Sequence, residues 1–263
     1  MNPGFRRWAA PICICCVLMS AWTGICRSEV VVFDRVTTVE TDIRLIVLTK
    51  GLLFAEGGRL VDIYLDGRHL KKILTGGDGL GYLKYTPQDP GLKQIKASSK
   101  ADSATGLLLV MGKNEKAIMI DIESAFKDAL FSNQSREDCR RVVNALGKNY
   151  RIIYLSRLVG KGIGRTWLKE QNFPESVILR WQGPDGLTAL KKRGVQLQAV
   201  VGSEDVLAAA KTEHIENRYA FEETQAGKTV KDWDEILRLL QPSPPAKAAS
   251  CEGEKGEAEK LGR

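Results

Sequence analysis

Two acidic residues stand two positions apart in the second half of the sequence. Asp121 lies within the apolar run 117–122 (AIMIDI), and Glu123 follows it directly. A continuous apolar run of this length is typical of a strand that is buried on both faces of a sheet. Residues two apart on an extended chain point to the same side, so the two carboxylates can share one pocket. Carboxylates placed in this way can supply a nucleophile or hold a hard cation.

Other polar groups follow two later apolar runs. Ser156 and Arg157 come after residues 151–155, and Ser203, Glu204 and Asp205 come after residues 197–201. In an open parallel sheet, ligands bind beyond the carboxyl ends of the strands, so these groups are expected to meet Asp121 and Glu123 there. A phosphoryl group would need such hydroxyl donors and, in addition, positive charge.

The positive charge is expected from a lysine pair. Lys191 and Lys192 end a helical stretch, and by position Ser156 would donate a hydroxyl to a phosphate while one lysine clamps its charge. Each residue also has a plainer interpretation. Asp121 can cap the next turn, Ser156 can bond the local backbone, and the lysines can form a solvated helix face.

A regular alternation of strands and helices must position these groups. Helical patterns begin at Ser135, with Asp138 as a capping-box partner, and end with an amphipathic helix over residues 232–240. Between them, extended and helical stretches alternate with short connections, which predicts a parallel sheet covered on both faces, over residues 115–240. The extended stretches are 117–122, 151–155, 177–181, 197–201 and 218–221, and the helical ones are 162–171, 184–192 and 204–211.

The first half of the chain has a different period. Short runs alternate apolar and polar residues with no helical segment between them, and turn sequences such as Asp66-Gly67 separate the runs. Asp-Gly between two such runs is a strong hairpin signal. Several short strands at this spacing predict a β-sandwich over residues 29–113. The runs are 30–36, 43–48, 60–65, 81–85, 92–97 and 106–111.

The two ends of the chain have special compositions. Residues 1–28 carry Arg6 and Arg7 before the apolar stretch 8–25 and then small residues, which is the layout of a bacterial secretory signal peptide. The same stretch could instead be an uncleaved membrane anchor, since it approaches the length that spans a bilayer. We therefore expect an exported protein of the periplasm or cell envelope, with N-terminal anchoring as the alternative. Residues 241–263 are rich in Pro, Ala, Glu and Lys and are expected to be disordered.

Charge and cysteine content exclude two further classes. The net charge of +7 falls to +4 without residues 1–28, and no basic run with interleaved aromatics is present, so nucleic acid is not an expected partner. Four of the six cysteines lie in the leader, which leaves Cys139 and Cys251 and no disulfide framework. The cores alone must therefore hold the fold together.

The first half resembles bacterial immunoglobulin-like domains. The resemblance is carried by residues 61–67 (VDIYLDG), by residues 81–87 (GYLKYTP) and by the following Pro90-Gly91. Domains of this kind act as spacers or adhesion modules. The resemblance therefore implies a protein partner for this region and says little about activity.

The second half resembles the haloacid-dehalogenase superfamily. In that family a strand-end aspartate attacks phosphorus, the acid two residues later is the general acid, and further acids hold magnesium. The resemblance implies that Asp121 is the nucleophile and Glu123 the general acid. It implies a magnesium set of Asp121, Glu204 and Asp205, and a ligand set of Ser156, Arg157, Lys191, Lys192 and Ser203.

The closer similarity is to the lipin-type branch, in particular the C-terminal domain of membrane-associated phosphatidylinositol transfer proteins. It is carried by residues 152–157 (IIYLSR), 165–168 (RTWL), 172–174 (NFP) and 201–206 (VGSEDV). The similarity covers roughly residues 117–221. It implies recognition of a phosphorylated ligand, such as the head group of an acidic phospholipid.

Two positions depart from the active pattern of that family. Active members have Asp-x-Asp, whereas Glu123 here is longer and displaces its carboxylate by about 1 Å, an error that can cost roughly a hundredfold in rate. Ser203 stands after Gly202 where the family has an acid, and a neutral hydroxyl is a poor magnesium ligand.

These departures favour a non-catalytic binding or scaffold protein of the envelope, with no cofactor. The alternative is a magnesium-dependent phosphatase that works through an aspartyl-phosphate. A third possibility is a purely structural module.

Overall fold

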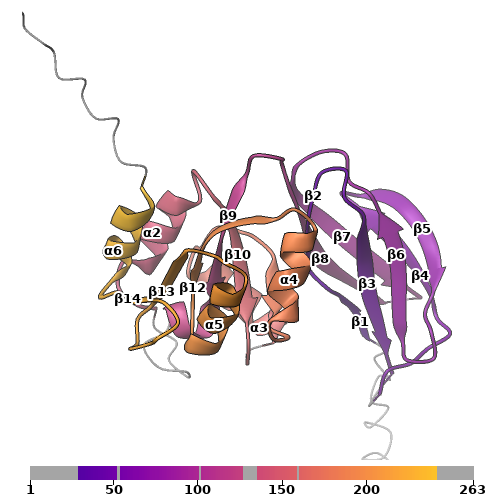
Figure 1. Ribbon diagram of the computed structural model, residues 1–263. Helices are drawn as coiled ribbons and strands as arrows, with labels where there is room; N and C mark the ends of the chain where they lie inside the picture. The colour runs from indigo at the N-terminus through magenta and orange to yellow at the C-terminus, as the bar shows by residue number, and fades with distance from the viewer. Residues whose placement is uncertain (1–28, 52–53, 101, 127–134, 159, 242–263) are drawn as a thin grey trace, which may run out of the picture.

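The computed structural model describes residues 29–51, 54–100, 102–126, 135–158 and 160–241. The expected leader (1–28) and nearly all of the expected tail lie outside these residues. Eight strands form the first half and an alternation of strands and helices the second (Figure 1). Among the described residues, no helix combines the length and apolarity that crossing a membrane requires.

The first half is a β-sandwich of two sheets, with strand orders β1-β3-β6 and β2-β8-β7-β4-β5. All its strand pairs are antiparallel except β2 with β8. Alternating side chains of both sheets form one apolar core, which includes Leu45, Ile63 and Ile95. The strands are β1 (Glu29–Val32), β2 (Arg35–Thr38), β3 (Ile43–Lys50), β4 (Leu60–Leu65), β5 (Arg68–Leu74), β6 (Leu80–Tyr85), β7 (Gly91–Ser99) and β8 (Asp102–Met111).

A tight hairpin joins β4 to β5. Asp66 and Gly67 both have positive φ, 49° and 80°, which is the backbone that an Asp-Gly turn favours. Strand β5 was not among the expected runs. It lies at the edge of its sheet and most of its side chains are exposed, so it shows no apolar alternation. The sandwich itself is confirmed by the strand pairing.

The second half is a parallel six-stranded sheet of order β11-β10-β9-β12-β13-β14. Strands in a doubly wound sheet diverge from the first strand, here β9, and a binding crevice forms where the order reverses. The elements are β9 (Lys116–Asp121), η1 (Ile122–Phe126), α2 (Cys139–Leu146), β10 (Arg151–Ser156), α3 (Lys161–Glu170), β11 (Ile178–Arg180), α4 (Asp185–Lys192), β12 (Gln196–Val201), α5 (Glu204–Thr212), β13 (Asn217–Ala220), β14 (Lys228–Thr229) and α6 (Trp233–Leu240).

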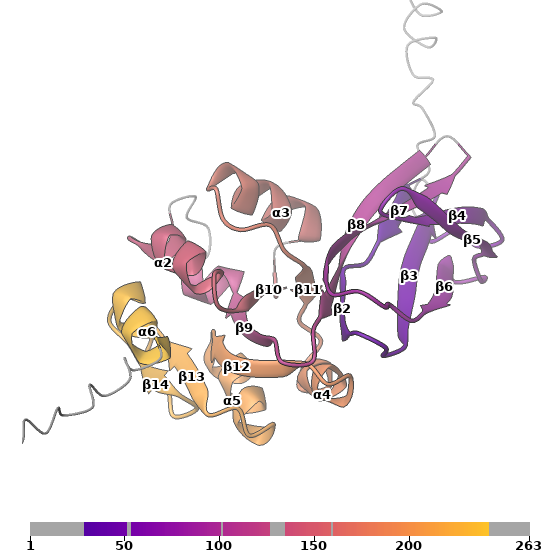
Figure 2. The same cartoon turned by 90° about the horizontal axis from the view of Figure 1, so that it is seen from above.

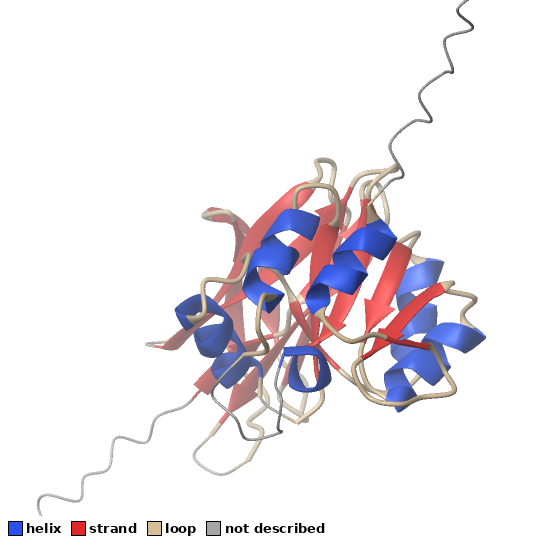
Figure 3. Ribbon diagram, turned by 90° about the vertical axis from the view of Figure 1, so that its left-hand side faces the viewer, coloured by secondary structure: helices blue, strands red, loops and turns tan. Residues whose placement is uncertain are grey.

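Both faces of this sheet are buried, as the apolar runs predicted. Ile118 and Ile120 point to one face, where α2, α3 and α6 pack, and Met119 points to the other, where α4 and α5 pack (Figure 3). The expected start of α2 at Ser135 is wrong. The helix begins at Cys139, because Asp138 has a left-handed backbone (φ 57°) and makes no capping hydrogen bond.

The sandwich completes the second of these faces. Val36 of β2 and Leu107, Leu109 and Met111 of β8 belong to the same apolar cluster as Leu187 and Leu190 of α4. In Figures 1 and 2, β2 and β8 lie beside α4. The two halves therefore share this apolar cluster and pack directly against each other.

A buried aspartate ties the two halves together. The side chain of Asp34, between β1 and β2, is fully buried. Its Oδ1 accepts from the backbone N–H of Leu107 at 3.0 Å, and its Oδ2 accepts from the N–H of Ile178 at 2.9 Å. Lys161 lies 3.1 Å from Oδ1, and Arg165 binds Oδ2. Charge and hydrogen bonds thus join the sandwich to β11 and to α3.

Candidate functional site

The expected carboxylate pair lies at the carboxyl end of β9, between the ends of β10 and β12. Asp121 is the last residue of β9, and Glu123 stands in the single π-helical turn η1 that follows. Turns of this type often mark functional sites. Both side chains are buried, and the backbone N–H of Glu123 donates to Oδ1 of Asp121 at 3.2 Å.

The carboxylate of Glu123 is fully engaged by the end of β10. Ser156 Oγ donates to Oε1 at 2.8 Å, and the backbone N–H of Leu158 donates to the same oxygen at 3.2 Å. The N–H of Arg157 donates to Oε2 at 3.1 Å. Three donors fix this side chain as an anchor for the loop after β10. A group held in this way is poorly placed to give a proton to a leaving group.

Arg157 supplies the positive charge of the cluster. Its Nη1 donates to Ser203 Oγ at 2.6 Å and lies 3.9 Å from Oδ2 of Asp121. Its Nη2 lies 3.2 Å from Oδ2 of Asp205. Ser203 Oγ, in turn, lies 3.1 Å from Oδ2 of Asp121 and 2.6 Å from Oδ1 of Asp205. The guanidinium therefore neutralises two acids from two different elements.

A glycine lies directly after β12, close to Asp121. A Cβ placed on Gly202 would lie only 3.1 Å from Cβ of Asp121. The absence of a side chain there allows Ser203 to reach the carboxylate. Glycine is thus favoured at this position by close approach and not by an unusual φ, since a side chain would force its neighbours to shift by a few tenths of an ångström.

Burial dominates the protonation of Asp121. Its pKa is raised to about 6, mainly by burial, and the nearby Glu123 carboxyl adds to the rise. The Ser124 hydroxyl and the Arg157 guanidinium lower the pKa in opposition. A nucleophilic carboxylate must be ionised, so the rise in pKa works against catalysis by Asp121 in mildly acidic surroundings.

The donor set does not fit a magnesium ion. Within the described part of the chain, no three His, Cys, Asp or Glu side chains come together as metal ligands. Asp121 and Asp205, two of the expected ligands, instead share the guanidinium of Arg157, and Glu204 is exposed in the first turn of α5. The cationic side chain lies where the resemblance implied a cation. No catalytic step can therefore be derived through magnesium here.

Lys191 and Lys192 do not join the cluster. They end α4 shortly before β12 begins at Gln196, so they lie at the opposite edge of the sheet from the end of β12. Lys191 Nζ donates to the backbone carbonyl of Glu213 at 2.5 Å and pairs with its carboxylate at 3.4 Å. The structure does not bring these lysines to the cluster, because helices that follow parallel strands run back toward the strand starts.

Of the nine residues expected at the site, the structure brings together Asp121, Glu123, Ser156, Arg157, Ser203 and Asp205. Sequence reasoning missed that Arg157 supplies all the positive charge these contacts provide. It also missed Asp34, whose partners come from distant segments. The sequence signals for Arg157 were its place directly after the strand-end Ser156 and the resemblance carried by residues 152–157.

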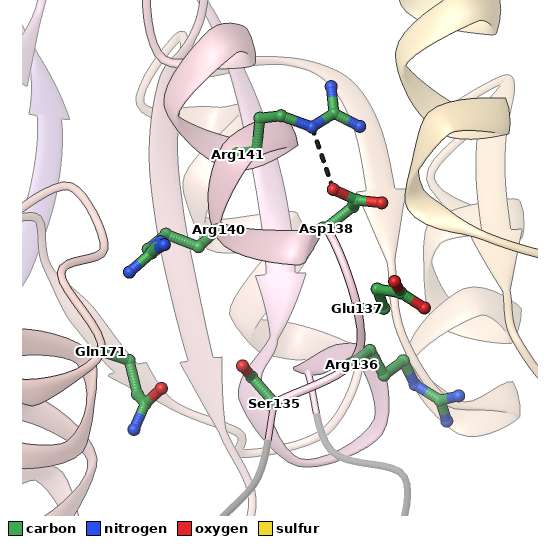
Figure 4. A pocket seen from close by; sticks show the side chains of 7 residues that line it. All are labelled: Ser135, Arg136, Glu137, Asp138, Arg140, Arg141 and Gln171. Carbon is green, nitrogen blue, oxygen red and sulfur yellow. Dashed lines mark hydrogen bonds and ion pairs between the residues drawn. The ribbon is translucent and has the colours of Figure 1, made fainter.

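A hollow with a volume of about 450 Å³ lies at the start of α2 (Figure 4). Its arginines do not converge on a common point. Arg141 bonds Asp138 at 3.0 Å and Asp234 at 2.6 Å, and Arg136 lies over the ring of Phe221. Arg140 points away from both in Figure 4. This hollow lacks the convergent polar groups of a binding site.

The sequence matches no family model and no curated protein. Solved structures similar to the chain include the "IG27 protein domain", at 14% identity and a TM-score of 0.28, over 34% of this chain and 98% of that chain. Fibronectin(III)-like modules of Clostridium thermocellum CbhA match at 10% identity and a TM-score of 0.25, over 32% of this chain and 97% of that one. The D00-D0 domain of intimin matches at 12% identity and a TM-score of 0.25, over 32% and 46%.

By their titles, these similar structures include an IG27 domain and fibronectin(III)-like modules. The architecture of the N-terminal sandwich rests on its own strand pairing. The haloacid-dehalogenase resemblance of residues 115–240 stays a prediction, and the structure shows a parallel sheet in that region.

Proposed function

We propose that the chain is a non-catalytic scaffold protein of the bacterial envelope. Its second half would be a degenerate domain of haloacid-dehalogenase type, in which an internal ion-pair network has replaced the metal and the phosphate. The observation that carries this proposal is the guanidinium of Arg157, which pairs with Asp121 and Asp205 and binds Ser203.

The alternative of an active phosphatase is disfavoured by the same contacts. An aspartate nucleophile needs a free oxygen in line with phosphorus, a proton donor and a hard cation. Oδ2 of Asp121 lies within hydrogen-bonding distance of Ser203, and the three donors on Glu123 fix the expected proton donor.

A phosphate-bearing ligand at this site would have to compete for Arg157. It would displace Asp205, whose side chain is half exposed, and would then face the buried carboxyls of Asp121 and Glu123. Like charges at such distances disfavour binding. Recognition of an acidic phospholipid head group is therefore the weaker part of the proposal. The sandwich remains the part proposed to contact a protein partner.

A turnover assay tests the scaffold proposal. Purified protein is incubated with magnesium and a phosphomonoester or phosphatidic acid, beside the matched variant Asp121→Asn. We expect equal, background release of phosphate from both. Magnesium-dependent release that Asp121→Asn abolishes would establish the phosphatase instead. Flotation with vesicles that contain or lack phosphatidic acid tests the ligand separately, and equal flotation would end the head-group hypothesis.

A further inference from the structure

Most of the large apolar side chains that the described residues expose lie along one side of the molecule. Phe54, Leu60, Leu74, Leu158 and Ile163 are between 58% and 80% exposed. We call these five residues the apolar edge. The other two such side chains, Tyr82 and Leu239, lie on β6 and α6. Apolar side chains gathered on one side of a soluble domain are characteristic of an interaction surface.

Three residues of the apolar edge lie at one end of the sandwich. Leu60 and Leu74 are direct partners in the pairing of β4 with β5. Phe54 precedes Ala55, which forms a bridge with Lys50, and Lys50 is the partner of Glu29 in the pairing of β3 with β1. The described chain therefore begins at the end of the sandwich that carries Phe54.

The other two residues lie on the same side, on the α/β half. Strand β8 starts at this end of the sandwich, and a turn at residues 112–115 reverses the chain so that β9 runs back toward it. The loop after β10 is tied down close to the sandwich end. Nζ of Lys161 donates to the carbonyl of Val32, three residues from Glu29, and to that of Thr105, three residues into β8. Leu158 and Ile163 flank Lys161. The starts of β1 and α3 both lie toward the lower side of Figure 1.

The chain outside the described residues adds an independent observation. The apolar stretch 8–25 ends four residues before Glu29. Four residues of extended chain reach at most about 14 Å. If residues 8–25 stay in a bilayer, Glu29 must lie within that distance of the apolar stretch, and the end of the sandwich that carries it must face the lipid. Arg6 and Arg7 would stay on the cytoplasmic side, which places the folded part on the opposite side.

We propose that residues 8–25 are retained as a membrane tether and that the apolar edge rests on the bilayer. The tether and the apolar edge meet on one side of the molecule, and lipid is the one occupant that serves both. Exposed apolar side chains are stabilised when they enter the boundary between head groups and acyl chains. As a consequence, the carboxyl edge of the α/β sheet, with Arg157, also faces the membrane. This inference concerns the placement of the molecule and does not depend on the proposed function.

Photo-crosslinking in vesicles tests the placement. The full chain is reconstituted in phosphatidylcholine vesicles with a benzophenone amino acid in place of Phe54 or Leu158. The matched controls carry it in place of Asp89 or Asn114, which are exposed at turns on the far side. We expect several-fold more lipid adducts from positions 54 and 158 than from 89 and 114. Equal yields at all four positions would overturn the proposal. In native membranes, crosslinks from positions 54 and 158 to protein, with none to lipid, would overturn it as well.

The tether has its own readout. Mass spectrometry of the chain extracted from the producing cell is expected to find residues 1–25 still attached. A mature protein that begins between residues 24 and 28 would refute the tether. Because phosphatidylcholine carries no net charge, neither result depends on whether the Arg157 cluster binds an anionic ligand.

Discussion

Two buried aspartates, one in each half of the molecule, show how differently a fold can accommodate the same side chain. Asp34 accepts from two backbone amides and contacts two cationic side chains, so its charge is compensated by groups on the sandwich and on the α/β half. Asp121 receives a backbone N–H and a shared hydroxyl, and its one cationic neighbour lies 3.9 Å away. The number and distance of the donors, more than burial alone, decide whether a buried carboxylate stabilises a fold.

Removal of Asp34 is expected to have the largest effect. Asp34→Ala leaves the Lys161 and Arg165 charges without their shared partner at the junction, and we expect a loss of about 4 kcal/mol in the free energy of unfolding. Urea denaturation measures it, and Asp34→Asn, which keeps the shape, should lose less. A loss below about 1 kcal/mol would mean that the apolar contacts alone join the halves.

The contrast with Asp121 appears in the pH dependence. Its pKa is raised to about 6 in the folded chain and is close to 3.8 when unfolded, so the folded state binds more protons between these values. This contribution to stability is present below pH 3.8 and is lost as the pH rises through 6. Relative to wild type, Asp121→Asn should gain about 2 kcal/mol between pH 4 and pH 7. Parallel stability curves for the two proteins would contradict the assignment.

Substitution of Arg157 is expected to have a smaller effect on stability and to create weak binding of a divalent ion. Arg157→Ala separates Asp121 from its cation and leaves Asp205 and Ser203 without the guanidinium, at an expected cost of about 1–2 kcal/mol. The freed carboxylates should then bind Mn²⁺ or Mg²⁺ weakly, which titration calorimetry can detect. Arg157→Lys is the control that keeps the charge. If the wild type binds the ion as well as Arg157→Ala does, the guanidinium is not the replacement for a metal.

The smallest effect on stability is expected from a substitution in the apolar edge. Leu74→Gln should change the free energy of unfolding by less than about 0.5 kcal/mol, because its side chain is exposed. The same change should lower the yield of lipid adducts from position 54 in the vesicle experiment. Tyr82→Gln, on β6 and outside the apolar edge, is the matched control and should leave that yield unchanged.

Much of the fold could be predicted because the period of apolar residues in the sequence agrees with the pattern of buried side chains in the strands. Alternation in the first half and continuous apolar runs in the second identified every strand with a buried face, from β3 to β12. Strand β5 escaped because it is an edge strand with few buried side chains. The start of α2 escaped because the left-handed backbone of Asp138 carries no local signal.

The candidate site was predictable only in part, because some of its contacts follow from sheet topology and others join distant segments. Groups at strand ends, such as Asp121 and Ser156, meet wherever a parallel sheet forms, so their position follows from topology. Lys191 lies away from the site because it ends a helix between two parallel strands, and such a helix ends at the edge of the sheet where the next strand begins. The bonds of Asp34 join segments more than 70 residues apart, and no local pattern encodes such a contact.

The junction between the halves has a consequence for the history and handling of this chain. Only residues 112–115 separate β8 from β9, and Glu115 closes that turn by accepting from Gly112 N–H at 2.9 Å and from Arg151 Nε at 3.0 Å. Because this connection is short and held by hydrogen bonds, it offers a protease no flexible segment to cleave. Recombination also finds no linker there at which the halves could be separated without loss of packing. A sandwich transferred alone to another protein would expose Val36, Leu107 and Leu109 to solvent.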